Sequence, residues 1–197
     1  MSTASPPRPV AVLDGAVTWT HGCLQLARAQ PLTLPTPCRD WDLGQLLEHM
    51  DDSLVALGEA AELGHVSVDP LPRRRTPEGL VDRLVQRACH TQAAWHRRIT
   101  SAPVSVGDLS LDRDTLLLVG ALEIAVHGWD VSQACGDERS IPEELAQPLH
   151  DIARTVVTWP ERGRRFEPPV EVDPSASAGT RLLGHLGRAT RRRARQI

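Results

Sequence analysis

The sequence of 197 residues lacks Lys, Asn and Tyr altogether and contains a single Phe. Every basic side chain other than His is therefore Arg. The missing residue types are those with A/T-rich codons, so this composition predicts a very GC-rich genome, such as an actinobacterial one. The formal net charge of −3 provides no general attraction to nucleic acid or to anionic membranes, and we expect neither as a partner.

Long apolar runs and paired cysteines are also lacking. The apolar stretches are interrupted well short of the ~20 residues of a membrane-spanning helix, and the N-terminal MSTASPPRPV has no apolar core of the kind found in signal peptides. We therefore expect a cytoplasmic protein, in a compartment that keeps thiols reduced. Cys23, Cys38, Cys89 and Cys135 form no C-x-x-C pair, which argues against a four-cysteine zinc site and against a disulfide framework.

Apolar residues recur at helical spacing in five segments of the chain. The expected helices cover residues 10–29, a segment that starts after Asp42, one that starts at Thr76 and Pro77, residues 114–135 and residues 142–158. Asp42 and Gln45 have the spacing of a capping box, and Gly136 is a typical helix stop. Residues 64–77 and 101–114 are expected to be connections.

Four long helices, with a long connection between the second and the third, indicate a mainly α fold built on a four-helix bundle. After residue 160 the chain changes character, since RFEPPVEV resembles a short extended segment and SAGTRLLGHLGR a short helix. We expect a disordered tail over residues 1–9, the bundle over 10–160, and a small C-terminal α/β appendage with a basic tail over 161–197.

The run LEIAVHGWDV, residues 122–131, places Glu123 in the middle of an apolar helix. An ionised carboxylate there loses hydration unless a partner compensates. Glu123 and His127 are spaced i, i+4 and so share one helix face, while His49 lies at the edge of the apolar stripe of the second helix. Two imidazoles and a carboxylate form a known zinc ligand set that leaves a position open, and iron, nickel or manganese would also accept them.

The spacing alone leaves other interpretations open. E-x-x-x-H pairs are common on helix surfaces, and a single His at a stripe edge usually packs or forms a hydrogen bond. Asp130 could accept a hydrogen bond from His127 or pair with an Arg on the surface. Trp41 and Trp129 could wall a metal pocket or belong to the core, and Cys38 could be a reactive thiol or a packed one.

Three segments carry a resemblance to a known family: PTPCRDWDLGQLLEHM, LEIAVHGWDVSQACG and GRRFEPPVEVDPSASAGTRLLGHLGR. They resemble the DinB-like metal-binding bundles related to mycothiol-dependent maleylpyruvate isomerase, over about residues 10–188. The resemblance implies a four-helix bundle with a metal, usually zinc, held by His49, Glu123 and His127. Many relatives have Asp in place of Glu123, and the isomerase has a longer C-terminal region, so its substrate contacts do not transfer.

The leading functional hypothesis is a metal-dependent enzyme of thiol chemistry, which uses a low-molecular-weight thiol, mycothiol, for S-transfer to an electrophilic small molecule or for its isomerisation. A thiol-independent metal enzyme of biosynthetic cyclisation or hydrolysis is the second hypothesis, and a non-catalytic small-molecule-binding or self-resistance bundle is the third. The residues identify no general acid or base, no substrate and no oligomeric state.

Overall fold

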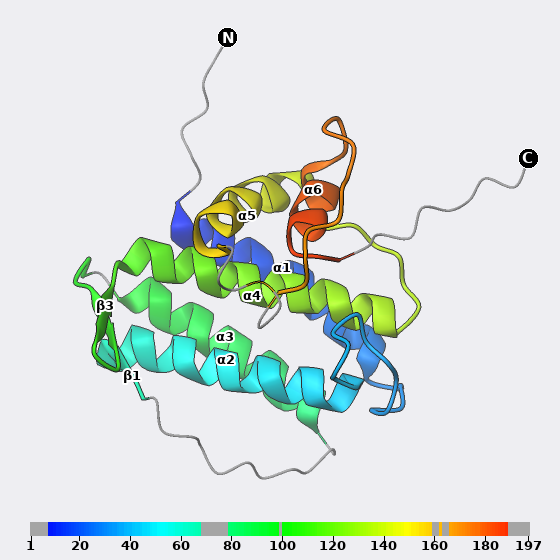
Figure 1. Ribbon diagram of the computed structural model, residues 1–197. Coiled ribbons are helices and arrows are strands. Elements are labelled where there is room, and N and C mark those ends of the chain that lie inside the picture. The colour runs from blue at the N-terminus through cyan, green and yellow to red at the C-terminus, as the bar shows by residue number, and fades with distance from the viewer. Residues whose placement is uncertain (1–7, 68–78, 99, 159–161, 163–165, 189–197) are drawn as a thin grey trace, which may run out of the picture. The chain divides into compact units, whose positions relative to one another are not determined.

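The structure is a computed structural model that describes residues 8–67, 79–98, 100–158, 162 and 166–188. The chain forms two compact units, Met1–Arg139 and Ser140–Ile197. The first unit contains the four long helices, and the second contains the two that follow them in the chain (Figure 1).

The first unit is a four-helix bundle, as the apolar periodicity predicts. Its helices are α1 (Pro9–Ala27), α2 (Leu43–Leu63), α3 (Leu80–Arg97) and α4 (Arg113–Ala134). Helix α1 packs against α4 and α3, and α2 packs against α3 and α4, so that each helix has two neighbours. The interior is mostly aliphatic, with fully buried leucines from every helix and Trp95 as the largest fully buried side chain.

Helix ends follow local sequence signals. The Asp42 side chain accepts a hydrogen bond from the Gln45 amide and the Gln45 side chain accepts one from the Asp42 amide, which confirms the capping box. Gly136, two residues after the end of α4 at Ala134, has a φ of 77°, a conformation that favours glycine. The expected start at Thr76 and Pro77 lies outside the described residues, as does most of the expected N-terminal tail; α1 already begins at Pro9.

Both segments expected to be plain connections contain strands. A small sheet of order β1-β2-β3 is formed by β1 (His65–Val66), β2 (Val104–Val106) and β3 (Leu109–Leu111), with β1 parallel and β3 antiparallel to β2. Gly107 and Asp108 make the two-residue hairpin turn, where Gly107 has a φ of 56°. Strands of two or three residues are too short for a period-2 pattern to reveal.

The second unit consists of α5 (Glu143–Val156) and α6 (Ala178–His185), which pack on each other. We expected the bundle to extend to residue 160, but the compact unit with α6 begins at Ser140 and includes α5. Glu143 connects the two helices, since its carboxylate accepts a hydrogen bond from the Ala178 amide at 2.9 Å. The described part of this unit has an isolated bridge between Arg162 and Phe166 but no strand, so its α/β character is limited to that bridge.

Helix α4 is long and apolar enough, by length and composition alone, to cross a membrane. In the structure 67% of its most apolar stretch is buried inside the protein. The core helix of a folded domain has the same composition, and this is how α4 is used: it packs against both α1 and α2.

Candidate metal centre

Glu123 projects from α4 toward α2 and meets two imidazoles. Its Oε1 lies 2.5 Å from Nε2 of His49 and 3.0 Å from Nε2 of His127. The Glu123 side chain retains 36% of its accessible surface and that of His49 34%, whereas His127 retains 10%. The partners that this carboxylate requires within an apolar helix are therefore the two histidines, and the three residues meet at a site that is open on one side.

Asp130 fixes the orientation of His127. Its carboxylate is completely buried, and its Oδ2 lies 3.0 Å from Nδ1 of His127, one turn back along α4. A hydrogen bond donated by Nδ1 leaves Nε2 as the nitrogen that faces Glu123. The structure thus places Asp130 where an acceptor for the second nitrogen of a metal-binding imidazole is expected, and not on the surface.

Cys38 belongs to the same cluster. Its Sγ lies 3.4 Å from Oδ2 of Asp130 and 3.9 Å from Nδ1 of His127. The sequence singles out Cys38 only as a thiol close to the start of α2. Its contact with Asp130 spans 92 positions of the chain, and no local spacing could have revealed it.

The two tryptophans beside the site differ in their positions. The Trp41 ring lies with its centroid 4.5 Å from that of His49 and 6.1 Å from that of His127, so it covers the imidazoles. Trp129 is only 4% exposed and is a core residue. It follows His127 by two residues, about 200° further around the helix, and therefore lies on another face of α4.

The charges of the cluster support one another. Burial opposes ionisation of Glu123, but the charge of His127 and the hydrogen bonds from both histidines outweigh it and hold the pKa of the carboxyl well below its usual range. Burial also disfavours the charged form of His127, whereas the Glu123 carboxylate and the hydrogen bond with Asp130 raise the pKa of this imidazole well above its usual value. Without a metal, Glu123 and His127 form an ion pair at neutral pH.

The donor set fits a divalent metal. The ligand atoms of His49, Glu123 and His127 all lie within 4.8 Å of one another. Two imidazole nitrogens and one carboxylate oxygen match the zinc sites that keep a position for water or substrate. Cys38, His127 and Asp130 form a second group within the same distance limit. Asp130 is completely buried and His127 nearly so, whereas His49 and Glu123 of the first group are partly exposed and can be reached by an ion and a substrate. The first group therefore remains the predicted metal site.

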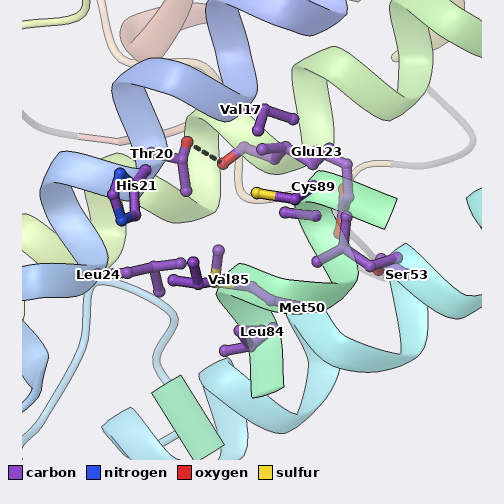
Figure 2. A pocket seen from close by; sticks show the side chains of 13 residues that line it. Val17, Thr20, His21, Leu24, Met50, Ser53, Leu84, Val85, Cys89 and Glu123 are labelled. Atoms are coloured by element: carbon purple, nitrogen blue, oxygen red, sulfur yellow. Dashed lines mark hydrogen bonds between the residues drawn. The ribbon is translucent and has the colours of Figure 1, made fainter. Parts of the chain in front are cut away.

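Glu123 also lines a pocket of the bundle (Figure 2). It has about 460 Å³ of empty space, part of it open to solvent, and side chains from all four helices of the bundle surround it. The lining residues are Val17, Thr20, His21, Leu24, Met50, Ser53, Leu54, Leu84, Val85, Ala88, Cys89, Glu123 and Ile124. The pocket could not be predicted from the sequence, because its residues follow the same apolar stripes as a filled core.

Comparison with known proteins identifies the fold. No protein-family profile matches the chain. Two uncharacterized proteins of Mycobacterium tuberculosis, MT0763 and Rv0738, are each 25% identical over 172 residues, which cover 83% of this chain and 88% of each relative. The crystal structure of the mycothiol-dependent maleylpyruvate isomerase is similar with a TM-score of 0.58 and 17% identity, over 76% of this chain and 71% of that one.

At this identity the structural likeness establishes the fold: the chain has the expected DinB-like bundle, shared with the isomerase. The relatives are mycobacterial, in keeping with the actinobacterial origin that the composition predicts, and that origin stays a prediction. The metal and its ligands also stay predictions, which rest on the geometry of the site.

Proposed function

We propose that the protein is a metal-dependent enzyme of thiol chemistry, acting in the cytoplasm on a small electrophilic molecule. The observation that carries the proposal is the meeting of His49, Glu123 and His127 from two helices, with Asp130 behind His127. Zinc suits these donors best, and nickel, iron or manganese are the alternatives. The fold shared with a mycothiol-dependent isomerase supports mycothiol as the thiol.

When bound, a divalent metal supplies a Lewis-acidic point at which a thiol is held as its thiolate at neutral pH. The residues of the chain prepare this point. His49 and His127 offer Nε2, Glu123 supplies one negative charge, and Asp130 keeps the His127 ring in place. The Trp41 ring shields the two imidazoles on one side.

The thiolate sulfur is the nucleophile of the proposed reaction. With an alkyl halide, the sulfur–carbon bond forms as the halide leaves with its bonding pair. With an epoxide, the ring oxygen receives the electrons and then a proton. With an activated alkene, addition followed by rotation and elimination returns the thiol and isomerises the double bond. No described residue of the site is assigned as a general acid or base.

Binding of the thiol can be measured without knowledge of the substrate. We would titrate zinc-loaded protein calorimetrically with mycothiol and with S-methyl mycothiol, a matched ligand that cannot ionise. The Cys38→Ser variant would be titrated in parallel, because the Cys38 thiol lies close to His127. We expect mycothiol to bind at least about tenfold more tightly than its methyl ether, and the preference to vanish in His49→Ala.

Equal binding of the two ligands to zinc-loaded protein would contradict the thiol reaction. The thiol-independent metal enzyme, which performs cyclisation or hydrolysis, would then be the better hypothesis. Protein that takes up no metal would favour a bundle that binds a small molecule without catalysis.

A further inference from the structure

The apolar pocket of the bundle has no role in holding a metal, yet it reaches the metal site. It is lined by α1, α2, α3 and α4, and Glu123 is the one residue that belongs both to the pocket and to the three metal donors. Met50 also lines the pocket, and it directly follows the predicted ligand His49 in α2. A molecule in the pocket would therefore have one end beside the proposed metal.

The lining indicates the chemistry of such a molecule. Most of the lining side chains are aliphatic or sulfur-containing, and no Arg is among the described residues that surround the space. Thr20 uses its hydroxyl within the protein, since Oγ1 donates to the Ile124 carbonyl at 3.0 Å (Figure 2). Glu123 is the one carboxylate and His21 the one imidazole among the described lining residues, and the other side chains offer little to pair with a charge, so the pocket favours an uncharged, apolar group.

The size of the space limits its occupant to a small group. Its volume of about 460 Å³ includes the part that is open to solvent, so the enclosed part is smaller. His21 and Cys89 are exposed residues of the lining, so the pocket opens to solvent on their side. Glu123 lines it as well, so the space borders both these exposed residues and the predicted metal site.

We propose that this pocket holds the apolar body of the substrate and directs its reacting end to Glu123 and the two imidazoles. The substrate class is accordingly a small, largely apolar molecule with one polar or electrophilic terminus. This inference rests on the proposed function for the reacting end, whereas occupation of the pocket by an apolar group is independent of it.

Two variants of α3 provide a matched test. Ala88 lines the pocket, whereas Ala93 is exposed on the same helix and is not among the lining residues. Ala88→Leu fills part of the space, and Ala93→Leu adds the same atoms outside it. Val85→Phe is a second filling variant for use if Ala88→Leu does not fold, as judged by circular dichroism.

The probes separate the pocket from the metal. Fluorobenzene, followed by ¹⁹F NMR, tests the pocket alone. Benzohydroxamate and acetohydroxamate, titrated into zinc-loaded protein, share a metal-chelating group and differ in the ring. We expect benzohydroxamate to bind at least about tenfold more tightly than acetohydroxamate to wild type and to Ala93→Leu. That gain should be lost in Ala88→Leu, with acetohydroxamate binding unchanged.

The proposal that the pocket holds an apolar group would be overturned if fluorobenzene failed to bind, or if it bound equally well to wild type and to a folded filling variant. If fluorobenzene bound but zinc-loaded protein bound benzohydroxamate no more tightly than acetohydroxamate, the proposal that the pocket directs its ligand to Glu123 would be overturned. Protein that binds fluorobenzene but takes up no zinc would overturn the proposed function and leave the pocket in place. The three failures are therefore distinguishable.

Discussion

At the scale of the single residue, Asp130 determines which nitrogen of His127 is available. It is fully buried and close to both His127 and Cys38. Because its carboxylate engages Nδ1 of His127, the same ring can offer only Nε2 to Glu123 or to a metal. Asp130 therefore controls the donor atom without being a predicted ligand itself.

Replacing Asp130 by Asn keeps an acceptor oxygen but removes the charge. We expect the apparent metal affinity to fall by about 10–100-fold, the usual effect of losing such a partner. Competition with a chromophoric chelator measures it. Asp114→Asn, on the exposed first turn of the same helix, is the control and should retain wild-type affinity. Unchanged affinity in Asp130→Asn would show that the carboxylate does not support the ligand.

Metal uptake should release a proton from His127. Because the pKa of this imidazole is raised in the metal-free protein, it is charged at about pH 7 and must become neutral to act as a ligand. Apparent affinity should rise with pH until the raised pKa is passed, and level off above it. Calorimetry in buffers of different ionisation enthalpy counts the protons, and an absence of proton release at neutral pH would contradict this assignment.

Local spacing accounts for part of this site and not for the rest. Glu123, His127 and Asp130 lie within three turns of one helix, so their common face could be predicted from the i, i+4 and i, i+3 intervals. His49 is 74 positions from Glu123, and only the bundle topology suggested their meeting. The contact of Cys38 with Asp130 depends on a loop conformation that no periodicity describes.

At the scale of elements, the close approach of α1 and α4 positions the site. The Thr20 hydroxyl bonds to the Ile124 carbonyl, and a Cβ added at Gly128 would lie 2.5 Å from Thr20 Oγ1. The absence of a side chain at Gly128 lets α4 approach α1 at this turn. Gly128 directly follows His127, so a shift of this turn would move a predicted ligand.

Gly128→Ala should destabilise the protein although Ala favours helix. Overpacking typically costs about 1–3 kcal/mol, against a propensity gain of about 1 kcal/mol, so we expect a net loss in the free energy of unfolding measured with urea. Gly120→Ala, on the same helix, meets only the end of the Leu57 side chain and should cost less. Adding Thr20→Ala to Gly128→Ala should recover part of the loss. Equal costs at both glycines would contradict the close packing.

The helices of the bundle could be predicted because each carries a long apolar stripe and two carry strong end signals, at Asp42 and Gly136. The sheet could not, since β1 has two residues, and β2 and β3 have three each. A Gly-Asp pair between alternating residues, at Gly107 and Asp108, was the one local signal of the hairpin.

At the scale of the whole molecule, all predicted ligands belong to the first compact unit, on two helices that are far apart in sequence. An ion held by both α2 and α4 binds the folded bundle and not the unfolded chain. Folding and metal binding are therefore coupled through mass action.

This coupling predicts a higher melting temperature with metal. Free metal at about 100 times the Kd adds about 2.7 kcal/mol, which raises Tm by about 5–10 °C in a chain of this length. Differential scanning calorimetry with zinc and after chelation measures the shift. His49→Ala should show a much smaller shift, and an equal shift in that variant would indicate that zinc binds elsewhere.

The central claim, that His49, Glu123 and His127 hold a metal, is tested most directly by metal content. Wild type, His49→Ala and the control His90→Ala, which pairs with Glu62 away from the site, would be purified without a His-tag and measured by plasma mass spectrometry. We predict close to one divalent metal per chain in wild type and His90→Ala, and a sharp reduction in His49→Ala. Metal-free wild type that also fails to take up added zinc would contradict the account, and Glu123 would then be stabilised by the two histidines alone.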